Sequence, residues 1–75
     1  MAKSNVTLYG KELRKLRIEK EEHGEDMARR LGISSSYLCM IERGHRDVPI
    51  GFTDKVAEAY SLKTKEKRRL IAAEP

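Results

Sequence analysis

One face of a short predicted helix carries side chains whose chemistry suits contact with a nucleic-acid groove. Leu38 and Ile41 are the only large aliphatic residues of the segment 35–43, so both must face inward. The opposite face carries polar and thioether groups: Ser36, Met40 and Arg43 on the face itself, with Ser35 and Cys39 beside it. Hydroxyls donate to or accept from base edges, a methionine contacts a thymine methyl, and an arginine binds a phosphate or a guanine. Apart from Cys39, which we expect to be an inert filler, these residues are candidate DNA contacts, and Arg46 is a candidate phosphate contact.

Each candidate also has a plainer interpretation. The serines can be ordinary first-turn helix residues, and Met40 can belong to a protein interface. Arg43 and Arg46 can be solvated charges, but two arginines beside a groove-facing helix favour phosphate contact.

The remaining reactive side chains predict neither catalysis nor a bound metal. His23 and His45 have no cysteine or histidine partner at zinc-ligand spacing, and Cys39 is the single cysteine. The sequence contains no glycine-rich phosphate loop, no nucleophile elbow and no convincing carboxylate pair. We therefore expect a protein that is not an enzyme and that uses no cofactor or metal.

A tight turn precedes the candidate helix. The preceding helix should end at Gly32, because glycine adopts the left-handed conformation at the lowest cost. Ile33 would fill the inside of the turn, and Ser34 is well placed to cap the next helix, which Gly44 ends in the same way. Two short helices joined by such a turn match helix-turn-helix geometry over about residues 24–43, although an ordinary helical hairpin has the same spacing.

Helical spacing of apolar residues continues along the chain, and no segment alternates as a strand does. The spacing predicts an all-α fold with five helices, at residues 9 to about 22, 25–31, 35–43, 52–60 and 65–73. Thr64 is the predicted cap of the last helix, and residues 1–7 are polar and expected to fray.

The combined pattern resembles the lambda-repressor-like, Cro/C1-type (XRE) DNA-binding domains of phage and bacterial regulators. The matching residues are Leu13, Leu16, Met27, Ala28, Leu31, Gly32, Ile33, Ser34, Tyr37, Leu38, Ile41, Glu42, Arg43, Gly44 and Pro49. The resemblance covers about residues 9–62 and implies a compact five-helix domain, often dimeric, whose third helix enters the major groove. We expect one domain over residues 1–75, with its core in 9–62 and a short C-terminal helix and tail in 63–75.

The resemblance also implies roles for individual residues. It adds Tyr37 as a phosphate contact. It implies an ion pair between Glu42 and Arg17 that ties the third helix to the first, with Arg17 shared between Glu42 and the DNA backbone. Four residues are then expected to be structural: Gly32, Ser34, Glu42 and Gly44.

The sequence departs from this family where the second helix begins. Family members usually carry a Ser or Thr cap followed by a Gln that contacts a phosphate, after a turn with a Gly and an apolar residue. This chain has Glu21, Glu22, His23 and Gly24 at those positions. Either the backbone amides still bind a phosphate, or this clamp is lost. A protonated His23 would restore it and make binding sensitive to pH.

Length and charge limit the remaining possibilities. Seventy-five residues, 39% hydrophobic, support one small domain without a deep cleft. The net charge of +4 is patterned: residues 19–26 carry −4, residues 29–46 carry +3, and residues 63–69 carry +4 from five basic and one acidic residue. The single cysteine and the lack of a long apolar run predict a soluble cytoplasmic protein.

These features predict a sequence-specific regulator that binds double-stranded DNA. The most direct interpretation is a phage, prophage or bacterial repressor that occludes a promoter, as a homodimer that forms in solution or only on DNA. The alternative is a protein-interaction module on the same fold, such as an antitoxin-like partner subunit. Neither interpretation involves a membrane or a small-molecule substrate.

Overall fold

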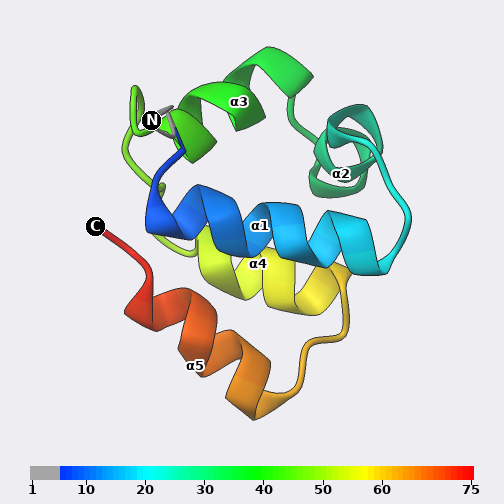
Figure 1. The fold of residues 1–75 in the computed structure, drawn as a ribbon, viewed down its shortest axis with the longest axis vertical. Coiled ribbons are helices and arrows are strands. Elements are labelled where there is room, and N and C mark those ends of the chain that lie inside the picture. Colours follow the sequence, from blue (N-terminus) through cyan, green and yellow to red (C-terminus); the bar gives the residue numbers. More distant parts are fainter. Residues whose placement is uncertain (1–5) are drawn as a thin grey trace, which may run out of the picture.

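Five helices account for most of residues 6–75, the part of the chain that the computed structural model describes (Figure 1). In chain order they are α1 (Leu8–Glu19), α2 (Gly24–Leu31), α3 (Ser35–Arg43), α4 (Phe52–Ala59) and α5 (Thr64–Ala72). No strand occurs within these described residues, so the predicted all-α fold is confirmed.

The turn between α2 and α3 forms as the sequence predicts. Gly32 ends α2 with φ +72°, and Gly44 ends α3 with φ +78°, both in the left-handed region. The Ser34 hydroxyl accepts a hydrogen bond from the Tyr37 backbone N–H at 3.1 Å, which caps the first turn of α3. The two glycines therefore end their helices and Ser34 caps α3.

The other helix ends differ from the prediction in three places. Lys20 ends α1 and Glu21 turns into the left-handed region with φ +55°, so α1 is shorter than predicted. The second helix begins at Gly24, one residue before its predicted start at residue 25. Thr64 is the first residue of α5 rather than its cap; Lys63 is the N-cap, and its backbone N–H donates to a Glu66 carboxylate oxygen at 3.0 Å.

The start of α1 is held in place by α3. Thr7 is the N-cap of α1, and its hydroxyl accepts from the Gly10 backbone N–H at 3.1 Å. The Thr7 backbone N–H and hydroxyl also both donate to the Glu42 carbonyl oxygen, at 2.9 and 3.0 Å. The expectation that residues 1–7 fray is therefore wrong for residue 7, and for residues 1–5 it lies outside the described part of the chain.

The core lies between α1 and the helices around it. In Figure 1, α3 and α5 occupy opposite ends of the longest axis, with α1 and α4 between them and α2 beside α3. All five helices, with the residue that ends α4, contribute buried apolar side chains: Tyr9, Leu13, Met27, Ala28, Leu31, Leu38, Ile41, Phe52, Val56, Tyr60 and Leu70. Leu70 is only 2% exposed, so α5 contributes to the hydrophobic core.

A chain of hydroxyl groups joins α1, α4 and the C-terminal residues. The Tyr9 hydroxyl lies 2.8 Å from the Thr53 hydroxyl, which donates to a Glu74 carboxylate oxygen. Burial of the phenol raises the pKa of Tyr9 to about 12. Tyr9 is therefore a buried, hydrogen-bonded anchor between α1 and α4.

Candidate nucleic-acid interface

The face of α3 that points away from the core carries the candidate contact residues. Leu38 and Ile41 are buried, 2% and 1% exposed, and Ser35, Ser36, Met40 and Arg43 are exposed. The helical orientation predicted from the sequence is therefore confirmed. Met40, at 40% exposed, places a large apolar surface among polar neighbours.

A shallow concavity runs along this outer face. It is lined by side chains of α3 and of the loop that follows it: Ser35, Ser36, Cys39, Met40, Arg43 and His45. His45 is the one member that the sequence did not predict, and its position directly after the glycine that ends α3 is the signal that could have found it. The structure therefore brings four predicted contacts together with a histidine and the expected filler Cys39.

Two other predicted contacts lie outside the lining of this concavity. Tyr37 packs partly against the hydrophobic core. Arg46 is exposed in the loop after α3, and its backbone N–H donates to the Met40 carbonyl at 3.3 Å. Tyr37 and Arg46 therefore lie beside the outer face of α3 and do not line its concavity.

The predicted ion pair between α1 and α3 is present. Glu42 is 3% exposed, and its carboxylate is paired with the Arg17 guanidinium. Arg14, which the sequence did not indicate, also approaches Glu42, with 3.4 Å between Nε and Oε1. The Arg17 side chain is 12% exposed and the Arg14 side chain 44% exposed, so Arg14 is the more accessible of the two cations.

Gly10 allows α1 to approach the end of α3 this closely. A Cβ atom at Gly10 would lie 2.3 Å from the Glu42 carbonyl oxygen and 2.6 Å from a Val6 methyl. Real Cβ contacts are never that short, so only glycine fits here without movement of the backbone. The backbone of Glu42 and its side chain are thus both held by α1.

Comparison with known families supports this geometry. Residues 8–70, most of the chain, match the helix-turn-helix domain family. The match covers α1 to α4 completely and α5 as far as Leu70. The chain belongs to the helix-turn-helix domain family. No curated protein and no solved structure matches it.

Family membership is consistent with the Cro/C1-type resemblance and indicates a DNA-binding regulator. Such helix-turn-helix domains are typically not enzymes. Among the residues described, no group of three or more His, Cys, Asp or Glu side chains could hold a metal ion. None of the described helices is long and apolar enough to span a membrane.

The N-terminus of α2 carries an acidic cap. His23 is the N-cap, and its backbone N–H donates to an Asp26 carboxylate oxygen at 2.8 Å. A negative charge of the protein itself therefore lies at the end of the helix where an amide N–H would otherwise bind a phosphate. His23 is exposed, and its effect on DNA binding stays a prediction.

Glu22 is part of a cluster that joins the α1–α2 turn to the end of α4. Its carboxylate accepts a hydrogen bond from the Tyr60 hydroxyl at 2.7 Å and pairs with Arg30. The Arg30 guanidinium carbon lies 4.6 Å from the centroid of the Tyr60 ring, a cation–π arrangement. Burial, with the Glu22 carboxylate nearby, raises the pKa of Tyr60.

We expect this cluster to make the stability of the domain sensitive to acid. The hydrogen bonds from Tyr60 and Arg30 hold the pKa of Glu22 below its usual value. Their contribution to stability is therefore complete above the unfolded pKa, about 4.3, and is lost as the pH falls through the lower folded value. Glu22→Gln should melt a few degrees below the wild type at pH 7, and the difference should shrink between pH 5 and pH 3.

Thermal melts followed by circular dichroism over that pH range measure the effect. Glu58→Gln, at an exposed position of α4, is the matched control and should keep the pH dependence of the wild type. A constant difference between Glu22→Gln and the wild type at all pH values would contradict the assignment.

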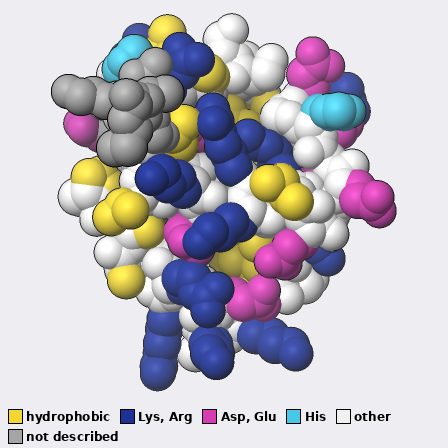
Figure 2. Space-filling view, viewed as in Figure 1, with side chains coloured by type: hydrophobic (Ala, Val, Ile, Leu, Met, Phe, Trp, Pro, Cys, Tyr) yellow, Lys and Arg dark blue, Asp and Glu magenta, His cyan; other side chains and the backbone are white. Residues whose placement is uncertain are grey.

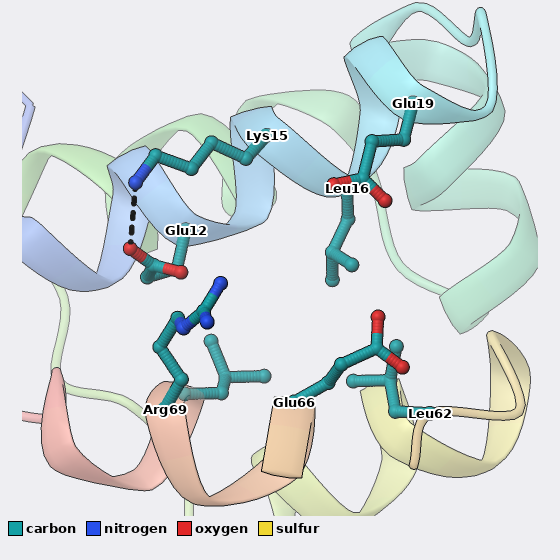
Figure 3. Close-up of a pocket in the computed structure, with 8 residues that line it drawn as sticks. Glu12, Lys15, Leu16, Glu19, Leu62, Glu66 and Arg69 are labelled. Atoms are coloured by element: carbon teal, nitrogen blue, oxygen red, sulfur yellow. Dashed lines mark hydrogen bonds and ion pairs between the residues drawn. The ribbon is translucent and has the colours of Figure 1, made fainter.

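A second hollow lies between α1 and α5, away from α3 (Figure 3). Its rim is mixed in charge: Glu12, Glu19 and Glu66 are acidic, Lys15 and Arg69 are basic, and Lys15 pairs with Glu12 at 3.1 Å. Leu16, Leu62 and Leu70 line its apolar part. No residue of α3 lines this hollow, so it is not part of the candidate nucleic-acid interface.

Proposed function

We propose that this helix-turn-helix domain is a sequence-specific regulator of double-stranded DNA in the cytoplasm, of the phage, prophage or bacterial repressor type. In this proposal α3 lies in the major groove, and the bound protein blocks a promoter. One observation carries it: the outer face of α3 exposes hydroxyl and guanidinium groups while its inner face is fixed to α1. A rigid helix that presents such groups is what groove recognition requires.

The proposed contacts divide by chemistry. Ser35 and Ser36, in the first turn of α3, face base edges, and Met40 offers apolar contact to a thymine methyl. The proposed phosphate contacts are Arg43, Arg46 and Tyr37, with Arg17 at the rim. Because Arg17 is mostly buried against Glu42, its contribution would be mainly to hold α3 in position.

A homodimer fits this proposal. Two copies of α3 about 34 Å apart would read two half-sites separated by one DNA turn. With Leu70 buried, α5 leaves only Ile71, 49% exposed, as a large apolar residue for a partner copy. This small surface supports a dimer that is weak in solution and assembles on the operator.

The decisive experiment compares α3 variants on a duplex selected by the protein from a random pool. Arg43→Gln should weaken binding about 5- to 150-fold, the range for loss of one good contact, and Ser36→Ala should relax selectivity at the positions it contacts. If Arg43 binds a phosphate, the slope of log K against log salt should become shallower by about 0.9. Fluorescence anisotropy at several salt concentrations measures both quantities.

Lys55→Gln is the control, because it removes one charge from an exposed position on α4. It should leave the affinity for the selected duplex within about twofold of the wild type. Wild-type affinity in the Arg43 and Ser36 variants, with both proteins folded, would contradict the assignment of the α3 face.

The acidic N-terminus of α2 favours one alternative. Asp26 places a negative charge at the N-terminus of α2, where helix amides would otherwise attract a phosphate, which would weaken DNA binding and suit a protein-interaction module such as an antitoxin-like subunit. A protein partner bound through Met40 and its neighbours would show little salt dependence, whereas DNA binding falls steeply with salt. The salt titration above therefore separates the two functions.

A further inference from the structure

The outer surface of α5 concentrates positive charge that the rest of the domain does not neutralise. Lys65 and Arg68 on α5, and Lys63 at its N-cap, are exposed, and among the described residues none of these side chains pairs with a carboxylate. We call these three residues the α5 basic face. By contrast, Lys67 on the same helix is paired with Asp54 at 2.6 Å.

The net positive charge of the chain equals the net charge of the segment that forms α5 and its N-cap. Residues 63–69 carry +4, equal to the net charge of all 75 residues, so the other residues sum to zero. Figure 2 shows Lys and Arg side chains projecting from the end of the molecule that α5 forms. In the hollow between α1 and α5, Glu12 and Glu19 of α1 lie across from Glu66 and Arg69 of α5 (Figure 3).

This face cannot reach a duplex that α3 occupies. The molecule is 34 Å long, and α3 and α5 lie at opposite ends of that axis (Figure 1). The helices make no direct contact, since α1 and α4 separate them. Any polyanion on the α5 basic face must therefore be a second molecule or a distant segment of the first.

The chemistry of the surface selects the kind of polyanion. Lys65 and Arg68 are three residues apart on α5 and so share one face of the helix. The one large apolar side chain that α5 exposes is Ile71, 49% exposed, three residues after Arg68. A single isoleucine offers a bilayer little apolar surface, whereas exposed cations without a carboxylate partner suit the regular phosphates of a DNA backbone, which bind by charge without sequence readout.

We infer that the α5 basic face binds the phosphate backbone of a second DNA duplex, so that a protein bound through α3 bridges two DNA segments. The inference rests on the proposed function, because α3 must hold the first duplex.

A two-duplex capture assay tests this inference. One duplex, carrying the selected site, is fixed to beads, and a second fluorescent duplex of unrelated sequence is added with the protein at low salt. Wild type should retain the fluorescent duplex, and Lys65→Gln/Arg68→Gln should retain about tenfold less or lower. The same variant should bind a single selected duplex within about twofold of the wild type, while Lys55→Gln behaves as wild type in both assays.

The outcomes separate the inference from the proposed function. Wild type that binds the single duplex but captures no second one overturns bridging and leaves the proposed function intact. Equal capture by the double variant also overturns it, because bridging would then depend on another surface, such as two α3 helices of a dimer. Binding of wild type to vesicles of phosphatidylglycerol without capture of DNA assigns the face to lipid instead. Failure to bind the selected duplex at all removes both proposals.

Discussion

Glu42→Ala should lower the free energy of unfolding by about 3–5 kcal/mol, because it leaves the mostly buried Arg17 guanidinium without its partner. For a domain of this size each kcal/mol corresponds to about 4–8 °C in melting temperature. The same change should weaken DNA binding, since the ion pair fixes α3 against α1. Arg14→Gln should cost much less, because its side chain is 44% exposed and its contact with Glu42 is 3.4 Å long.

Urea titration and thermal melting measure the loss of stability, and anisotropy on the selected duplex measures the affinity. Glu58→Ala, at an exposed position on α4, is the control and should change stability by less than about 0.5 kcal/mol. If Glu42→Ala left both the melting temperature and the DNA affinity unchanged, the structural role of Glu42 would be wrong.

Gly10→Ala should destabilise the domain by about 2–4 kcal/mol although it adds a single methyl group. The new Cβ would meet the Glu42 carbonyl oxygen at 2.3 Å, so α1 and the end of α3 must separate. Separation strains or breaks the two hydrogen bonds from Thr7 to that carbonyl. Because α3 moves with its last turn, DNA affinity should fall together with stability.

Gly24→Ala is the matched control. Gly24 is also a helical glycine, at the start of α2, but a Cβ there has no atom within 4 Å. Alanine should therefore stabilise this position by about 0.4–1 kcal/mol, because it restricts the unfolded chain. Melting temperatures that moved in the same direction for both variants would contradict the close packing assigned to Gly10.

The sequence was sufficient for features that depend on a few neighbouring residues. Gly32, Ser34 and Gly44 define the ends of α2 and α3 through backbone conformation and capping, which act over three or four residues. The inward orientation of Leu38 and Ile41 followed from helical geometry alone. For these reasons the all-α fold, the helix-turn-helix and the outer face of α3 were predictable before any contact was known.

The charged positions were harder to interpret, because side-chain partners can lie far along the chain. Nothing in the sequence near Glu22 indicates that its carboxylate accepts a hydrogen bond from Tyr60, 38 positions away. No residue close to Arg14 in the sequence indicates that it takes part in an ion pair, because its partner Glu42 is 28 positions away. The Arg17–Glu42 pair was expected only through a family resemblance.

The sequence by itself determined the local geometry of the recognition unit and the excess of positive charge in residues 63–69. Only the tertiary structure decided that Thr7 and Gly10 hold the end of α3, that Leu70 belongs to the core, and that the basic α5 lies opposite α3. The two kinds of feature differ in the distance along the chain over which the interactions act. Caps and turns are fixed by backbone energies within one helical turn, whereas close approach, burial and the placement of charge depend on how the helices pack.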